Sequence, residues 1–156
     1  MLVSVAPEAL EIGAIGEKGS VVSDGWRVNN AHVEVESRRA YLYVRTQGAL
    51  DTVSDVEQVV VIMRDRMVHA SLRKLLVDLR QVVIPMPDDA CHAAWQFVHG
   101  RDYELLACAL PEDAGNLMVT RINMTGVSSG LPFRAFANVV DAHRWLDLKP
   151  SGLHRR

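Results

Sequence analysis

The chain has 156 residues, a length at which a single domain buries roughly 70 % of the surface that its unfolded chain exposes. With 49 % hydrophobic and 23 % charged residues, it has the composition of an ordinary globular protein rather than a disordered, fibrous or membrane protein. A net charge of −2 and basic clusters without interleaved aromatic residues argue against a nucleic-acid partner.

Residues 1–30 are rich in glycine and serine, and this density of turn-forming residues predicts an N-terminal extension rather than a long helix. Short strands around residues 10–15 and 21–28 would form a hairpin anchored by Trp26. The segment begins without basic residues and contains two early glutamates, so it does not resemble a signal peptide. We expect a cytoplasmic protein with no transmembrane segment, and one hypothesis for the extension is a homodimer interface.

Two adjacent strands follow the extension. Residues 31–36 alternate polar and apolar side chains, and residues 41–45 do the same, which is the period of two expected for strands with one buried face. The polar residues 37–39 between them predict a tight turn, and Gly48 ends the second strand. The two strands are therefore expected to pair as a hairpin.

A helix begins at the capping pair formed by Thr52 and Asp55 and runs to about Ala70, with Asp55 and Glu57 expected to face water. Strands and helices then alternate. The expected elements are a strand at 75–79, a helix from Asp88 to Gly100, a strand at 104–110, a helix from Asp113 or Asn116 to Gly126, a strand at 133–137 and a helix from Asn138 that stops at Pro150.

This order of elements predicts an α/β fold with a mixed, mostly parallel sheet of about five strands and four helices. Helices that connect neighbouring strands cover the faces of a parallel sheet, which explains the nearly continuous apolar run at residues 75–79. No composition shift marks a further boundary, so residues 31–150 are expected to form a single domain.

Three core segments, taken in order, resemble the SpoIIAA-like proteins, a bacterial branch of the STAS family. They are residues 74–80 (KLLVDLR), residues 104–110 (ELLACAL), and residues 133–136 (FRAF) followed by residues 141–146 (DAHRWL). The resemblance covers about residues 31–148 and implies the SpoIIAA-like fold. Because these segments form the core rather than a reactive site, they support the fold better than an activity.

STAS domains act as phosphorylation switches, with a serine at the start of the helix after the central strand. This chain departs from that pattern, because residues 79–91 contain neither serine nor threonine, and a serine switch is therefore not expected here. Asp88 and Asp89 lie near that position, and one interpretation is that they imitate a phosphorylated serine. Capping of the helix start is the simpler interpretation, since acidic residues favour the first turn of any helix.

Other chemistry-bearing residues have ordinary interpretations. Asp78 resembles the phosphoacceptor of a response-regulator receiver, but the acidic pair that would hold Mg²⁺ is missing from the expected place. His92 and His99 stand seven residues apart, roughly 10 Å along a helix, which is too far for one metal ion. Cys91 and Cys108 lie in apolar contexts, which predicts free thiols in the core rather than a disulfide.

We therefore predict a non-catalytic STAS-like module, without a cofactor or metal, that recognises a protein partner or a small apolar ligand. The ligand alternative arises because the SpoIIAA-like fold is also likened to lipid-carrying domains. The recognition surface that the resemblance implies consists of Arg80, Asp88, Asp89, His92 and Trp95. The rival hypothesis is an enzyme that uses His92, Asp78 or Cys91 in a pocket at the strand ends.

Overall fold

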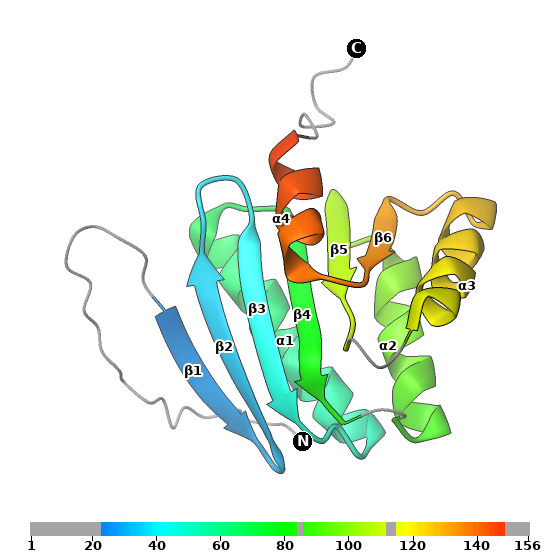
Figure 1. The fold of residues 1–156 in the computed structure, drawn as a ribbon. Coiled ribbons are helices and arrows are strands. Elements are labelled where there is room, and N and C mark those ends of the chain that lie inside the picture. The colour runs from blue at the N-terminus through cyan, green and yellow to red at the C-terminus, as the bar shows by residue number, and fades with distance from the viewer. Residues whose placement is uncertain (1–22, 84–85, 112–114, 149–156) are drawn as a thin grey trace.

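A computed structural model describes residues 23–83, 86–111 and 115–148 of the chain. These residues form one six-stranded sheet and four helices (Figure 1). In chain order the elements are β1 (Ser23–Val28), β2 (Ala31–Ser37), β3 (Leu42–Gly48), α1 (Val53–Ala70), β4 (Lys74–Val82), α2 (Asp88–Gly100), β5 (Leu105–Ala109), α3 (Gly115–Ser128), β6 (Phe133–Phe136) and α4 (Val139–Leu148).

The strands lie in the sheet in their order along the chain, from β1 at one edge to β6 at the other. The pairs β1–β2 and β2–β3 are antiparallel, whereas β3–β4, β4–β5 and β5–β6 are parallel, each parallel pair being joined through a helix. The predicted mixed, mostly parallel α/β sheet with four helices is therefore confirmed. The sheet has six strands instead of about five.

The additional strand is β1, formed by Ser23–Val28 and paired along its length with β2. It coincides with the strand expected around residues 21–28, and its Trp26 packs against the main core as expected. The sheet thus begins inside the segment that the sequence set apart as an extension. The strand expected at residues 10–15 lies outside the described residues.

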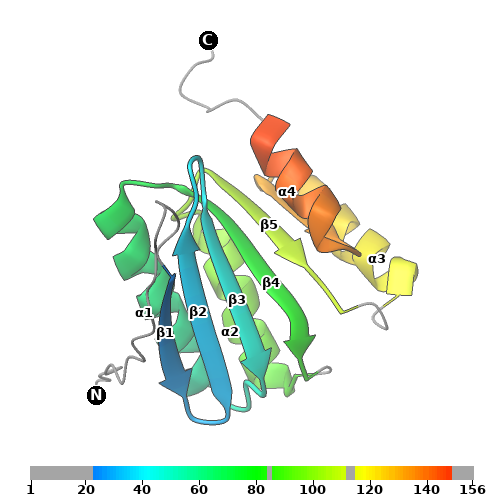
Figure 2. The ribbon, with the colours of Figure 1, turned by 60° about the vertical axis from the view of Figure 1, so that its left-hand side comes forward.

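The helices divide the two faces of the sheet unequally. Helices α1 and α2 cover one face, α4 lies on the opposite face over β4 and β5, and α3 packs beside β6 (Figures 1 and 2). The larger core forms between the sheet and α1 and α2, and a smaller core forms under α4 around Leu76 and Leu146. Beside α4, the same face of β1, β2 and β3 and of the end of β4 from Asp78 to Gln81 is not covered by a further helix of the described chain, and we call it the open face.

The predicted cap of α1 is confirmed. Thr52 Oγ1 accepts a hydrogen bond from the Asp55 backbone amide at 3.1 Å, and Asp55 Oδ2 accepts one from the Thr52 amide at 3.2 Å. The expectation that Asp55 faces water is wrong, because its side chain is 1 % exposed. Its carboxylate also accepts hydrogen bonds from the Asn29 side chain and the Asp51 amide, which makes its burial favourable.

Helix α4 is capped as predicted, because Asn138 Oδ1 accepts a hydrogen bond from the Asp141 amide at 2.8 Å. The prediction that Asp88 and Asp89 cap α2 is wrong: Pro87 occupies the cap position, and neither aspartate makes a capping hydrogen bond. Both lie in the first turn, where their charge still meets the positive end of the helix dipole.

Candidate functional site

An apolar pocket of about 190 Å³ lies between the sheet and the helices that cover its larger core. Strands β3, β4, β5 and β6 form its floor, and side chains of α1, α2 and α3 form its walls. Thr46, Val77 and Cys108 belong to the floor, whereas Met63 and Trp95 belong to the walls. The lining is almost entirely hydrocarbon and sulfur.

Strand periodicity explains why the floor is apolar. Alternate side chains of a strand point to the same face, so Leu75, Val77 and Leu79 of β4 all point toward α1 and α2. Small side chains explain why space remains there, because Ala94 on α2 and Ala135 on β6 lie where larger residues would fill the volume. The pocket therefore results from small side chains that different elements contribute to the same part of the core.

Thr46 is the exception in this lining. It lies on β3 after Leu42 and Val44, at the same parity, and its side chain therefore points into the larger core. The residue is 2 % exposed, and its hydroxyl oxygen has no hydrogen-bond partner within the described protein. An unpaired hydroxyl in an apolar surrounding is unfavourable, which makes this group a candidate for contact with a ligand.

A β-bulge lies directly opposite Thr46. The register of β3 against β4 pairs Arg45 with Asp78 and Gln47 with Gln81, so two residues of β4, Leu79 and Arg80, oppose the single Thr46. An extra residue of this kind re-aims the side chains around it. Leu79 lines the pocket, whereas Arg80 and Gln81 both lie on the open face.

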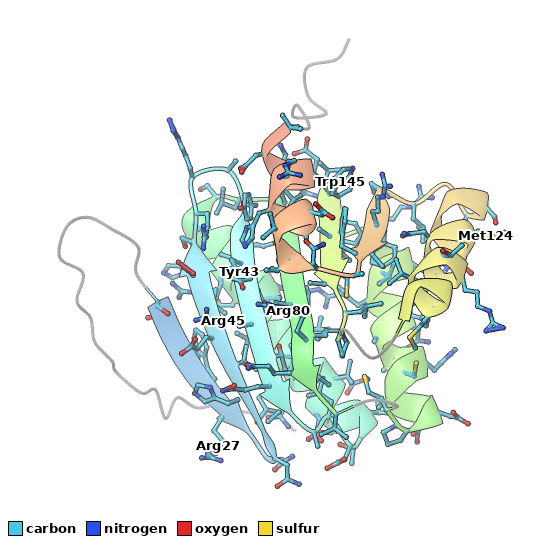
Figure 3. All side chains as sticks on the ribbon, in the orientation of Figure 1. Arg27, Tyr43, Arg45, Arg80, Met124 and Trp145 are labelled. Carbon is cyan, nitrogen blue, oxygen red and sulfur yellow. The ribbon has the colours of Figure 1, made fainter. Side chains whose placement is uncertain are left out.

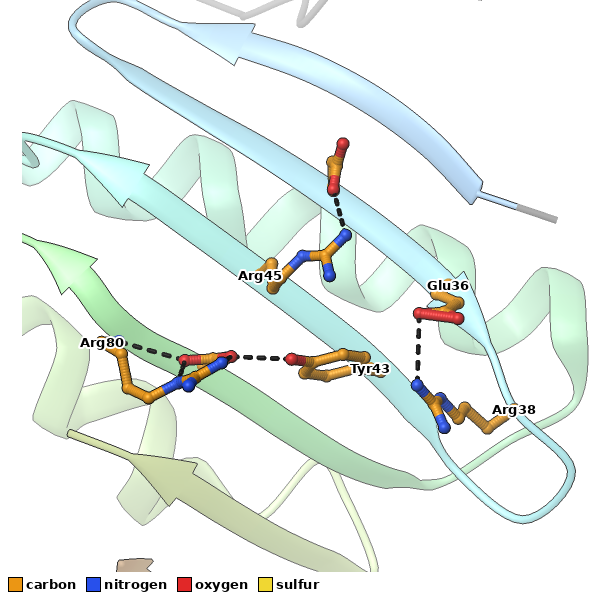
Figure 4. A network of polar contacts seen from close by, with 7 residues as sticks. Glu36, Arg38, Tyr43, Arg45 and Arg80 are labelled. Carbon is orange, nitrogen blue, oxygen red and sulfur yellow. Dashed lines mark hydrogen bonds and ion pairs between the residues drawn. The ribbon is translucent and has the colours of Figure 1, made fainter. Parts of the chain in front are cut away.

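The open face carries a polar network around Asp78, which is 3 % exposed (Figure 4). Its carboxylate accepts a hydrogen bond from the Tyr43 hydroxyl at 2.7 Å, two from the Arg80 guanidinium at 2.8 and 2.9 Å, and one from the Arg80 amide at 3.1 Å. Burial raises the pKa of Asp78, but the hydrogen bonds from Arg80 and Tyr43 outweigh it and hold the pKa below its ordinary value.

Further aromatic and cationic groups surround this network. The guanidinium carbons of Arg38 and Arg45 lie 5.1 and 5.5 Å from the centre of the Tyr43 ring, within the range of cation–π attraction. Figure 3 shows Tyr43, Arg45 and Arg80 on the same side of the sheet as α4. His143 of α4 packs edge-on against Tyr43, and burial lowers the pKa of its imidazole.

This network is better suited to structure than to catalysis. Asp78 already accepts four hydrogen bonds, and its lowered pKa makes it a weak base. Arg45 and Arg80 each have a carboxylate partner, Glu34 and Asp78. The arrangement fixes β3 and β4 against each other on the open face, with each of these three charges paired.

The structure separates the residues that the sequence grouped into one recognition surface. Trp95 is half-buried and lines the pocket, whereas Asp88, Asp89 and His92 are exposed on α2. Arg80 lies on the opposite face of the sheet, since its side chain binds Asp78. Of the five predicted residues, only Trp95 thus reaches the apolar pocket.

The residues of the rival enzyme hypothesis are also not brought together. Asp78 points to the open face, whereas Cys91 and His92 are exposed on α2 across the sheet. In residues 23–83, 86–111 and 115–148, no group of three or more His, Cys, Asp and Glu side chains could hold a metal ion. The expectation that both thiols lie in the core is wrong for the exposed Cys91, whereas burial raises the pKa of Cys108 to about 12.

Comparison with known proteins identifies the fold. No protein-family model matches the sequence, and no curated protein sequence matches it. A solved structure of an uncharacterised protein of the DUF3478 family from Shewanella loihica PV-4, which has a SpoIIAA-like fold, superposes with a TM-score of 0.53. It is 18 % identical and covers 75 % of this chain and 94 % of its own. This chain has a SpoIIAA-like fold.

The resemblance seen in the core segments is therefore confirmed as a likeness of fold. At 18 % identity the SpoIIAA-like structure transfers no activity to this chain, so function must be argued from its own residues. Within the described helices, none combines the length and apolarity needed to cross a bilayer. The apolar pocket and the buried Thr46 hydroxyl remain the features of this SpoIIAA-like domain that bear most directly on function.

Proposed function

We propose that this protein is a non-catalytic binding module that takes up a small, largely apolar ligand in the pocket between the sheet and helices α1, α2 and α3. The carrying observation is the pocket itself, about 190 Å³ in volume and lined by aliphatic, aromatic and sulfur-containing side chains. Binding sites for small molecules are concave and mostly apolar, with few polar groups. Water finds few hydrogen-bond partners in such an apolar space, so its displacement by an apolar molecule is favourable.

The volume indicates the size of the ligand. An apolar protein cavity of about 150 Å³ accommodates benzene, so the pocket here suits a single substituted ring or a short hydrocarbon chain. Trp95 and Phe133, which lie edge to face with ring centres 5.8 Å apart, offer aromatic contacts at one wall. Met63 offers an adaptable thioether contact at another.

Toluene titration of the full chain, followed by nuclear magnetic resonance, tests this proposal. Toluene should shift the signals of pocket residues, including the Trp95 indole, with a saturating dose dependence. Ala94→Leu adds three carbons to the pocket wall and should weaken toluene binding at least about tenfold, since it occupies the space of the ligand. Gln96→Leu is the matched control, because it adds a leucine to the exposed side of the same helix.

The expected pattern is binding by the wild-type chain and by Gln96→Leu, with loss of binding in Ala94→Leu. The proposal fails if toluene leaves the pocket signals unchanged in the wild-type chain. It fails equally if Ala94→Leu, shown to be folded by its spectrum, binds toluene as tightly as the control. Either result would mean that the pocket is a packing defect rather than a binding site.

A further inference from the structure

The floor of the pocket contains one hydroxyl that the protein leaves without a partner. Thr46 is 2 % exposed, and its Oγ1 atom is the one buried side-chain nitrogen or oxygen in the described chain that makes no hydrogen bond within it. Buried polar groups are nearly always hydrogen-bonded, and each exception calls for an explanation. Because Thr46 lines the pocket, a ligand bound there would supply the missing hydrogen-bond partner.

A bound water molecule is a poor partner for this hydroxyl. A buried water needs two to four polar contacts, and the Thr46 hydroxyl provides one. The rest of the described lining offers weakly polar sulfur atoms and the indole of Trp95, which already packs against Phe133. A molecule that fills the pocket with apolar atoms and presents one polar atom to Thr46 satisfies both the volume and the hydroxyl.

We propose that the ligand is a neutral, largely apolar molecule with a single hydrogen-bonding group at its buried end, such as a phenol or an alcohol, and that Thr46 Oγ1 binds this group. The inference rests on the proposed function. A hydroxyl both donates and accepts hydrogen bonds, so it can pair with either a donor or an acceptor on the ligand. The ligand is neutral because the pocket lining, as far as it is described, contains no charged side chain to pair with an ion.

Two features of β3 support this role for Thr46. Rotation about its Cα–Cβ bond moves the hydroxyl among three staggered positions without movement of the backbone. Strand β3 is paired on both sides, with β2, where Val33 is the partner of Thr46, and with β4 on either side of the bulge. The hydroxyl is therefore presented from a rigid floor, as a recognition group should be.

Phenol and toluene are the probes, because they differ by the same exchange of hydroxyl for methyl as Thr46→Val. Affinities of both are measured by calorimetry for the wild-type chain, Thr46→Val and Thr46→Ser. We expect the preference for phenol over toluene to fall about 3- to 10-fold in Thr46→Val, which is the range of one net hydrogen bond. Thr46→Ser keeps a hydroxyl and should keep the wild-type preference.

The outcomes separate this inference from the proposed function. If neither probe binds the wild-type chain, the proposed function fails and this inference fails with it. If toluene binds but the phenol preference is equal in the wild-type chain and Thr46→Val, the inference alone is overturned. Valine is β-branched like threonine and suits a strand, and the circular dichroism spectrum checks the fold. Loss of the preference in Thr46→Val with retention in Thr46→Ser establishes the contact.

Discussion

Asp78→Asn is expected to destabilise the protein because the buried carboxylate holds β3 and β4 together on the open face. Asp78 accepts four hydrogen bonds, three from Arg80 and one from Tyr43. An asparagine keeps the shape of the side chain but has one acceptor oxygen and a donor in place of the second oxygen. If its oxygen faces the Arg80 amide and Nε, its amide nitrogen faces the Arg80 Nη2 donor and the Tyr43 hydroxyl.

The hydrogen bond from Arg80 Nη2 is thus lost, and the contact with Tyr43 persists only in reverse, with the asparagine amide donating to the Tyr43 hydroxyl oxygen. Hydrogen bonds to charged groups contribute about 1.5–3 kcal/mol each. The Arg80 side chain is 42 % exposed and recovers part of its loss from water, whereas Tyr43, a residue 5 % exposed, exchanges a hydrogen bond to a charged carboxylate for a weaker neutral one. We therefore expect a loss of about 2 kcal/mol in the free energy of unfolding, or a fall in melting temperature of about 4–8 °C for a domain of this size.

Urea unfolding at pH 7 measures this loss. Glu34→Gln is the matched control, because the Glu34–Arg45 pair on the same face is exposed at both partners and should contribute at most about 1 kcal/mol. The reasoning is refuted if Asp78→Asn and Glu34→Gln have equal urea midpoints. It would also be refuted by an Asp78→Asn chain that is as stable as the wild-type chain.

The pH dependence gives a second check on Asp78. Its pKa is lower in the folded chain than in the unfolded chain, where an aspartate titrates at about 3.9. The stabilisation is therefore fully present above the unfolded pKa and is lost as the pH falls through the lowered folded pKa. The difference between the wild-type chain and Asp78→Asn should be constant from pH 5 to 7 and shrink on acidification below about pH 4.

Two further predictions concern the edge of the sheet and the thiols. Asn123→Ala should lower the free energy of unfolding, measured in urea, by about 2 kcal/mol, because the Asn123 side chain both accepts a hydrogen bond from and donates one to the backbone of Ala135 on the edge strand β6. The control Ser128→Ala, at an exposed position of the same helix, should change this free energy little. Ellman's reagent at pH 8 should modify the exposed Cys91 rapidly and Cys108 slowly, since a pKa of about 12 leaves Cys108 almost wholly protonated. A rapid phase that survives Cys91→Ser would contradict this order.

Local signals predicted most of the fold. The alternation of polar and apolar residues located β2 and β3, because a strand with one covered face must alternate. The caps of α1 and α4 were found because their hydrogen bonds join residues three apart in sequence. Strand β1 was harder to assign, since its place in the sheet depends on pairing with β2 rather than on its own glycine-containing sequence.

The pocket could not be predicted in the same way. Its volume depends on Ala94, Cys108 and Ala135, which come from three elements and meet only in the folded chain. One signal was available: Thr46 is a polar residue at the parity of Leu42 and Val44, which face the core. A polar residue at a core-facing position of a strand points to a special environment, because its polar atom must find a hydrogen-bond partner or remain unpaired at a cost in free energy.

The position of Arg80 shows how a bulge limits inference from the sequence. Arg80 lies near the end of β4, and the family resemblance implied that it shares a surface with Asp88 and His92. Strand parity instead places it with Asp78, on the face away from α2, and the bulge keeps Gln81 on that face as well. The same bulge lies opposite Thr46, so one irregularity of β4 both collects polar groups on the open face and borders the hydroxyl in the pocket. A variant that removed the bulge would therefore be expected to alter the polar network and the pocket together.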